Sequence, residues 1–110
     1  MNKRNAFASR VDGNAKEIDD ALLECGVSIL KLDMIGKGCP DRLMGFRGLS
    51  VLIEYKRDYD YQRTVRGKPY TERVRGKLTD DQEKWIREWQ GQPVVIARTI
   101  EEAKAALGIV

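Results

Sequence analysis

The segment 49–56 (LSVLIEYK) constrains the fold of this chain more than any other feature. Its β-branched and apolar residues are typical of a strand. Because side chains alternate along a strand, three apolar residues share one face: Val51, Ile53 and Tyr55. Leu52 lies on the opposite face, together with the charged residues Glu54 and Lys56. Apolar residues on both faces predict a central strand of a covered sheet.

Three helices are predicted where apolar residues recur at helical spacing: 14–25, 80–90 and 100–107. Thr79 and Thr99 directly precede the second and third helices as N-cap residues. Gln82 and Glu102 occupy the reciprocal positions of a capping box. Glycines follow all three helices as stop signals.

Three further strands are predicted from short β-branched, apolar runs: 27–32, 41–46 and 93–97. The pair Arg47-Gly48 is a tight turn, so the strands 41–46 and 49–56 should form a hairpin. The resulting order is helix, three strands, helix, strand, helix. This order predicts one α/β domain, in which helices flank a mixed central sheet.

At 110 residues the chain has the size of one ordinary domain. A domain of this size buries about two-thirds of its unfolded surface, so a bound metal would serve chemistry rather than folding. Cys25 and Cys39 lack the spacing of a disulfide scaffold or of a zinc site. No apolar run approaches about 18 residues and no signal-peptide pattern is present, so we expect a cytoplasmic protein without a membrane partner.

Positive charge is concentrated in two segments, although the net charge is only +3. Residues 1–13 are interpreted as a basic arm. The segment 57–77 carries seven Lys and Arg residues against three acids. Such a distribution would hold a polyanion beside carboxylates elsewhere in the chain, although a charge run can also be only a solvated face.

The predicted hairpin brings acidic and basic residues together. Asp41 opens its first strand directly after Pro40, while Glu54 and Lys56 leave the second strand on one face, about 7 Å apart. Hydrolysis of a phosphodiester needs an activated water and neutralised phosphate charge, which divalent cations held by carboxylates supply. The alternative is a plain ion pair between Glu54 and Lys56, worth at most about 1 kcal/mol. The three residues together favour a metal-dependent active site.

From Asn14 to Leu107 the chain resembles the PD-(D/E)XK nuclease superfamily. It is most similar to the virus-type replication-repair (VRR-NUC) and Holliday-junction-resolvase-like members, which phages often encode. Their pattern is a helix with an acid, a strand, a PD, an E-x-K and a helix that begins near a glutamine. This chain has the corresponding residues in order: Glu17, Asp41, Glu54 with Lys56, and Gln82.

The resemblance implies a restriction-endonuclease-like core and an endonuclease that hydrolyses DNA with Mg²⁺ or Mn²⁺. Its expected place is phage or bacterial DNA processing, at junctions, flaps or nicks, and a homodimer is also implied. Asp41, Glu54 and the backbone carbonyl of Tyr55 would hold the metal. Glu17 would complete the metal shell, and Lys56 would orient or activate the water.

Two residues of the implied catalytic set also fit helix caps. Asn14-x-x-Glu17 and Thr79-x-x-Gln82 both match the capping box, so capping or catalysis would explain Glu17 and Gln82. Two neighbouring acids on the first helix are rivals for the role of Glu17: Asp19 and Asp20.

The segment 57–77 departs from the simplest family pattern and is interpreted as an insertion or an extended hairpin. It is long for a loop in so small a domain, which suggests a function. Its three tyrosines are interleaved with basic residues, a composition suited to phosphate contacts and base stacking. We expect an arm that clamps branched or single-stranded DNA; the alternative is an exposed loop. The candidate DNA contacts are Lys37, Arg57, Arg63, Arg66, Lys68, Arg73, Arg75 and Lys77.

Trp85 and Trp89 lie four residues apart on one helix face, which favours core packing over base stacking, with a dimer seam as an alternative. The GKGCP turn around Lys37 lacks the P-loop pattern, so no nucleotide cofactor is predicted. Two other functions stay open. One is a non-catalytic nucleic-acid-binding module on a nuclease-like fold, and the other is a nuclease that acts on RNA.

Overall fold

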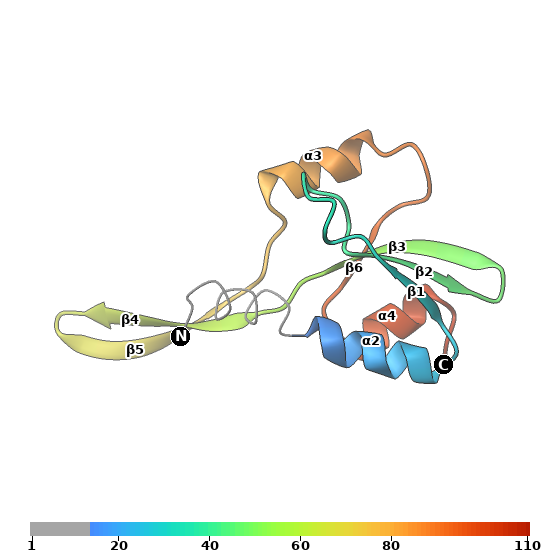
Figure 1. Cartoon of the computed structure of the whole chain (residues 1–110). Helices are drawn as coiled ribbons and strands as arrows, with labels where there is room; N and C mark the ends of the chain where they lie inside the picture. Colours follow the sequence, from blue (N-terminus) through green and yellow to red (C-terminus); the bar gives the residue numbers. More distant parts are fainter. Residues whose placement is uncertain (1–13) are drawn as a thin grey trace.

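The computed structural model describes residues 14–110, and the basic arm predicted for residues 1–13 lies outside this range. None of the helices within 14–110 combines the length and the hydropathy that a membrane span needs. The described chain folds into three helices and six strands (Figure 1). In chain order they are α2 (Ala15–Glu24), β1 (Ser28–Lys31), β2 (Arg42–Phe46), β3 (Leu49–Tyr55), β4 (Tyr59–Val65), β5 (Lys68–Val74), α3 (Asp80–Glu88), β6 (Val95–Ala97) and α4 (Ile100–Ala106).

The main sheet has the strand order β1-β2-β3-β6, with β3 in the interior. β1, β2 and β3 pair antiparallel, and β6 pairs parallel to β3. The prediction of an α/β fold with a mixed sheet is therefore confirmed, and so is the hairpin from β2 to β3. Its turn residues Arg47 and Gly48 both have positive φ, at 48° and 83°. The tightest hairpin turns require this backbone conformation.

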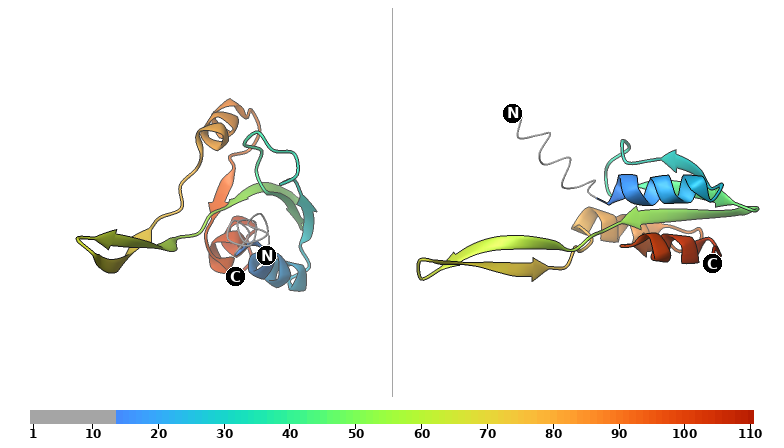
Figure 2. Two further views of the ribbon diagram at one scale, coloured as in Figure 1. Left: turned by 60° about the vertical axis from the view of Figure 1, so that its left-hand side comes forward. Right: turned by 90° about the horizontal axis from the view of Figure 1, so that it is seen from below.

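Helices α2 and α4 lie side by side against one face of the main sheet (Figures 1 and 2). Alternate residues of β2 and β3 point toward these helices, because side chains alternate along a strand. The buried apolar core includes Ile18, Leu22, Met44, Val51, Ile53, Ala97, Ala103 and Leu107. Leu52 and Glu54 therefore point to the opposite face of β3.

Helix α3 lies on the side of the sheet opposite α2 and α4 (Figure 1) and buries none of its residues. The prediction that Trp85 and Trp89 pack into the core is wrong. The Trp89 side chain is 44% exposed and Trp85 is half-buried. The two rings stack on each other with centroids 4.8 Å apart, so each supplies apolar contact that a core would otherwise provide.

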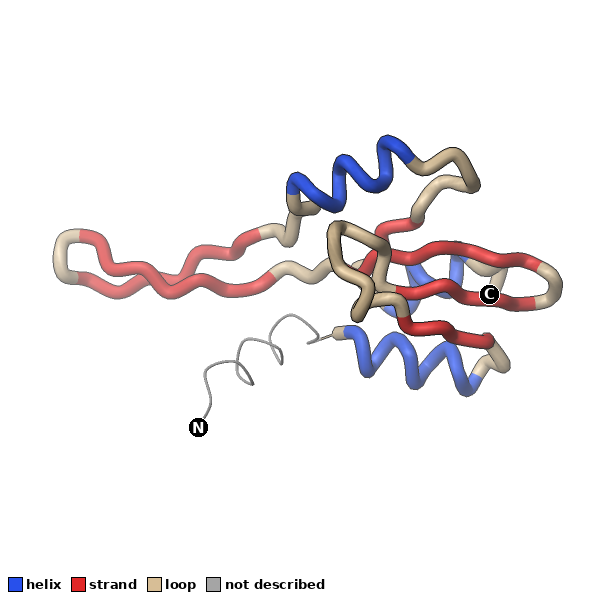
Figure 3. The backbone as a smooth tube through the Cα atoms, turned by 45° about the horizontal axis from the view of Figure 1, so that its top comes forward, coloured by secondary structure: helices blue, strands red, loops and turns tan. Residues whose placement is uncertain are grey.

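Strands β4 and β5 form a separate two-stranded sheet that projects from the domain as a hairpin (Figures 1 and 3). This confirms the extended hairpin predicted for 57–77. Its two strands, β4 and β5, are additional to the strands in the predicted order. Every residue of the two strands is exposed except Val74, which is half-buried. We call β4, β5 and their turn the arm.

The base of the arm is fixed to the domain through Gly76. Its N–H donates to Asp58 Oδ1 at 3.2 Å, and its carbonyl accepts from Arg98 Nη2 at 2.8 Å. A Cβ at this position would lie 2.2 Å from the Arg57 carbonyl oxygen. Only glycine allows the two chain segments to approach this closely.

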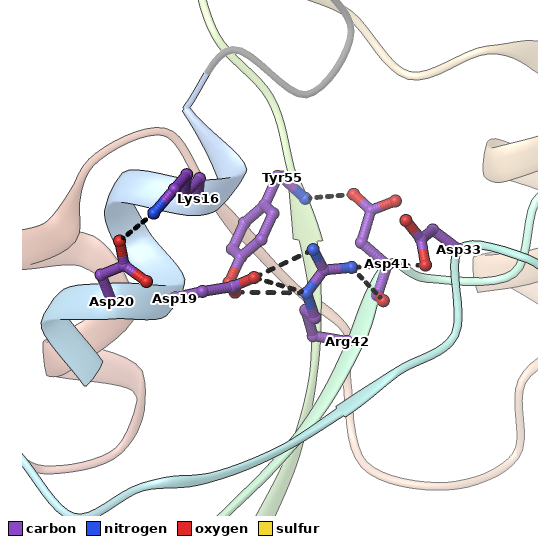
Figure 4. Close-up of polar contacts among 7 residues, drawn as sticks. All are labelled: Lys16, Asp19, Asp20, Asp33, Asp41, Arg42 and Tyr55. Carbon is purple, nitrogen blue, oxygen red and sulfur yellow. Dashed lines mark hydrogen bonds and ion pairs between the residues drawn. The ribbon is translucent and has the colours of Figure 1, made fainter. Parts of the chain in front are cut away.

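A buried polar network joins α2 to β2 and β3 (Figure 4). The Arg42 guanidinium donates to both carboxylate oxygens of Asp19 at 3.0 to 3.2 Å. The Tyr55 hydroxyl donates to Asp19 Oδ1 at 2.5 Å, and Arg42 Nη1 lies 3.6 Å from Asp33. Buried charges are costly unless they are paired, so these residues depend on one another.

Replacing Asp19 should destabilise the domain strongly, because Asp19→Ala leaves the Arg42 guanidinium with only the more distant Asp33 carboxylate. We expect the free energy of unfolding in urea to fall by about 3 kcal/mol. Asp20→Ala is the matched control, since Asp20 is exposed and its partner among residues 14–110 is the exposed Lys16. Equal losses for the two variants would contradict a structural role of the network.

Candidate active site

Asp41 is held at the start of β2 by three hydrogen bonds. Its backbone carbonyl accepts from the N–H of Leu32 at 2.8 Å and from Arg42 Nη1 at 2.9 Å. Its carboxylate oxygen Oδ2 accepts from the backbone N–H of Tyr55 at 2.8 Å (Figure 4). The carboxylate is therefore fixed against β3, one residue from Glu54.

Glu54 is the most deeply buried acid of the described chain, with 2% of its surface exposed. Its Oε2 accepts from Gln82 Nε2 at 2.8 Å and lies 3.7 Å from Lys56 Nζ. The other oxygen, Oε1, is buried and receives no hydrogen bond from the described residues. An ionised carboxylate with an unpaired buried oxygen is unfavourable, so without metal the group favours a proton, which it can share with the neighbouring Asp41 carboxyl.

The electrostatics of the pair follow from this burial. Desolvation and, after it, the negative charge of Asp41 raise the pKa of Glu54 to about 8, against the opposing effect of Lys56. Desolvation also raises the pKa of Asp41, against the hydrogen bond from the Tyr55 N–H. Two neighbouring carboxyl groups in a dry site cannot both ionise easily, so the pair retains a proton at neutral pH.

Lys56 lies on the same face as Glu54, as the alternation of β3 predicts, although the strand ends at Tyr55. Its amino group approaches Glu54 without a short hydrogen bond, at 3.7 Å. The predicted ion pair is present. It does not account for the site, because it leaves Oε1 of Glu54 bare and the pKa of Glu54 high.

Gln82 forms the predicted helix cap and also contacts the acid pair, while its catalytic role stays a prediction. The Thr79 side chain accepts from the Gln82 N–H at 3.2 Å, and the Gln82 side-chain oxygen accepts from the Thr79 N–H at 2.9 Å. This is the predicted capping box. The amide nitrogen of the same side chain donates to Glu54. One amide therefore joins the first turn of α3 to the acid pair.

The capping box predicted for Asn14 and Glu17 is wrong. The Asn14 side chain caps nothing and donates instead to the carbonyls of Lys56 at 2.9 Å and Arg98 at 3.4 Å. Glu17 is exposed on α2 and does not line the cleft described below. Its metal-binding role stays a prediction. The buried acid of α2 is its rival Asp19, which the network around Arg42 holds.

Sequence reasoning missed two residues that position the site, Arg42 and Asn14. Arg42 had a detectable signal: it shares a strand face with the apolar residues Met44 and Phe46, and a buried arginine requires an acidic partner. Asn14 had none, because its acceptors are backbone carbonyls far away in the sequence.

A cleft of about 580 Å³ contains the acid pair. Its lining joins Asp41, Glu54, Lys56 and Gln82 to residues at the base of the arm: Tyr59, Arg75 and Lys77. Of the predicted DNA contacts, Arg57, Arg75 and Lys77 line this cleft. Four others lie farther along the arm: Arg63, Arg66, Lys68 and Arg73. Lys37 is exposed in the turn before Asp41 and does not line the cleft.

The residues present fit a divalent cation in part. Within residues 14–110, no three His, Cys, Asp or Glu side chains form a ready-made metal cluster. The bare oxygen of Glu54 and its neighbour Asp41 nonetheless form a two-carboxylate donor set. Mg²⁺ commonly binds to one or two carboxylates and keeps several water ligands.

Comparisons of the chain with protein-family models, curated proteins and solved structures find no match. The resemblance to the nuclease superfamily therefore depends on its motif residues.

The free energy of unfolding should fall as pH rises from about 4.5 to about 8 without metal, because the folded state retains the Glu54 proton that the unfolded chain releases. We expect a loss of more than about 1 kcal/mol, or at least about 4 °C in melting temperature. Glu54→Gln should flatten the pH profile. The exposed Glu17→Gln should leave it unchanged, and parallel profiles for the parent and Glu54→Gln would contradict the assigned pKa.

Gly38 should be essential for the position of Gln82, because a Cβ there would lie 2.2 Å from the Asp81 carbonyl oxygen in the first turn of α3. Gly36 is the matched control: both glycines have positive φ (83° and 76°), but a Cβ at Gly36 meets nothing. Gly36→Ala should cost about 1 kcal/mol of stability from backbone strain. Gly38→Ala should cost at least about 1 kcal/mol more. Equal costs would show that the contact does not restrain α3.

Proposed function

We propose that this protein is a metal-dependent endonuclease of nucleic acid, with DNA as the expected substrate, on a restriction-endonuclease-like core. The observation that carries the proposal is the acid pair: Asp41 and Glu54 meet in a cleft, the buried Oε1 of Glu54 has no donor among residues 14–110, and Lys56 Nζ lies 3.7 Å from its Oε2. Structural ion pairs normally satisfy their buried oxygens. A pair that is left unsatisfied beside a basic cleft is typical of a site that binds a cation.

The carboxylates of Asp41 and Glu54, with the carbonyl of Tyr55, would hold Mg²⁺ or Mn²⁺. When bound, the cation would neutralise charge on the scissile phosphate and lower the pKa of a water ligand. Gln82 keeps the Glu54 carboxylate in place, and the Tyr55 N–H does the same for Asp41. Binding of the cation requires loss of the proton that the acid pair shares, so affinity should rise with pH.

The basic residues around the acid pair have separate roles in this proposal. Lys56, two residues from Glu54 on the same face, would orient the attacking water or contact the phosphate. Arg75 and Lys77 enter the cleft from the base of the arm and would hold the flanking phosphates. The cleft thus combines a cation site with an anion site, as phosphodiester hydrolysis requires.

The second candidate function is a nucleic-acid-binding module without catalysis. Two observations favour it: the described residues contain no ready-made cluster of three metal ligands, and Glu17 is exposed away from the cleft. The close pair of carboxyl groups, which raises the pKa of Glu54, favours the enzyme. A binding module has no need of two carboxyl groups beside bound phosphates. The homodimer and the cytoplasmic location stay predictions.

Cleavage of supercoiled plasmid, four-way junctions and flap substrates should require Mg²⁺ or Mn²⁺ and cease with a chelator. Asp41→Ala and Lys56→Ala should each reduce the cleavage rate at least about 100-fold while binding the same substrates. Asp20→Ala, an exposed change on α2, is the control and should cleave like the parent.

The enzyme proposal fails if the folded parent leaves every substrate intact with both metals, or if the two site variants cleave as fast as the parent. Binding without cleavage by the parent would favour the non-catalytic module. Cleavage rates on RNA versions of the same substrates show whether the site accepts deoxyribose, ribose or both.

A further inference from the structure

The two faces of the arm differ in chemistry. Strand register places Arg63 opposite Tyr70 and Tyr61 opposite Glu72, and residues opposite each other in a sheet share a face. One face, which we call the aromatic face, carries Tyr59, Tyr61, Arg63, Val65, Lys68, Tyr70, Glu72 and Val74. The other, the polar face, carries Asp60, Gln62, Thr64, Pro69, Thr71 and Arg73. All three tyrosines of the arm are therefore on one side.

The tyrosine rings of the aromatic face are accessible. Tyr61 is 52% exposed, Tyr70 40% and Tyr59 36%. The Arg63 guanidinium lies 5.8 Å from the centre of the Tyr70 ring. Rings flanked by cations on an exposed strand surface are the combination on which unpaired nucleobases stack, while the cations contact the backbone phosphates.

The charge of the arm favours a polyanion over a second copy of this chain. The segment 57–77 has seven basic and three acidic residues, a net charge of +4 that exceeds the +3 of the whole chain. Asp60 and Glu72 are already paired with Arg73 and Arg63. Two positively charged arms would repel each other, whereas the phosphates of a nucleic acid would neutralise the charge of the arm.

The aromatic face continues into the cleft. Tyr59 and Val74 are opposite each other at the base of the arm, and both line the cleft that contains Asp41 and Glu54. The seven residues of β4 extend about 20 Å from this point to the tip. A strand of several nucleotides could follow this face to the acid pair.

We propose that the aromatic face of the arm is a stacking platform for unpaired nucleobases, so that the substrate carries a single-stranded stretch next to the bond that is cleaved. This inference rests on the proposed function for the choice of substrate. Bases inside an intact duplex cannot reach the rings, so a blunt duplex would contact only the cations of the arm. The polar face would contribute little to binding.

The test measures fluorescence anisotropy with a labelled oligothymidylate and a blunt duplex of equal charge, in the Asp41→Ala background with a chelator. The parent arm should bind the single strand more tightly. Each ring should contribute at least about a factor of five to the Kd for the single strand, so the double variant Tyr61→Ala/Tyr70→Ala should bind it at least about 25-fold more weakly. The Kd for the duplex should stay nearly unchanged.

The chain offers a matched control on the opposite face. Gln62 donates to the Thr71 hydroxyl across the same two strands at 2.8 Å, so Gln62→Ala/Thr71→Ala removes one pair without touching a ring. It should retain the parent affinity for both probes. Tyr61→Phe/Tyr70→Phe should retain single-strand binding, because stacking needs the ring and not the hydroxyl.

Three results would overturn the inference: parent affinity for the single strand in the alanine variant, an equal loss for both probes, or loss in the control variant. A parent dimer that Tyr61→Ala/Tyr70→Ala dissociates in sedimentation, with nucleic acid binding unchanged, would assign the aromatic face to self-association. Because the assay measures binding without metal, it gives its answer even if the cleavage experiments refute the nuclease.

Discussion

The buried guanidinium of Arg42 is the interaction on which the candidate site depends. It binds Asp19 on α2, approaches Asp33 and donates to the carbonyl of Asp41. Neighbouring residues on β2 and β3 then divide between two environments. The side chains of Arg42 and Tyr55 bind Asp19 in the buried network, although both residues also line the cleft in which Asp41 and Glu54 meet. The rigidity of the acid pair is thus derived from packing on the other side of the same two strands.

The acid pair is a local exception to the rules that stabilise the rest of the domain. The buried carboxylate of Asp19 is fully paired, and among the described residues only Arg98 Nη1 shares with Glu54 Oε1 the lack of a hydrogen-bond partner in a buried position. Glu54 is instead buried beside a second carboxyl group and retains a bare oxygen. Hydrogen bonds from Gln82 to Glu54 and from the Tyr55 N–H to Asp41 offset part of the unfavourable burial and hold the two carboxyl groups together. Such exceptions are expected where function opposes stability.

The sequence predicted the elements whose signal is local. The alternation along 49–56 placed Glu54 and Lys56 on one face, and Thr79 with Gln82 predicted a cap that the structure contains. It could not predict contacts that depend on packing. The amphipathic pattern of α3 does not tell whether its tryptophans meet a core or each other. Helical spacing likewise could not decide between Glu17 and Asp19, because the choice depends on how α2 is rotated against the sheet.

Because side chains alternate along a strand, an odd or even number of residues between the base of the arm and a tyrosine decides which face that tyrosine lies on. Because the base is fixed at Gly76 by Asp58 and Arg98, the residues that enter the cleft are set by counting outward from that point. Adding one residue to each strand near the base would turn the tyrosines away from the acid pair, whereas adding two would restore them. Changes at the tip would alter reach without altering orientation. Insertions of any length at the tip would therefore preserve the aromatic face, whereas insertions at the base would preserve it only if they add two residues, or a multiple of two, to each strand.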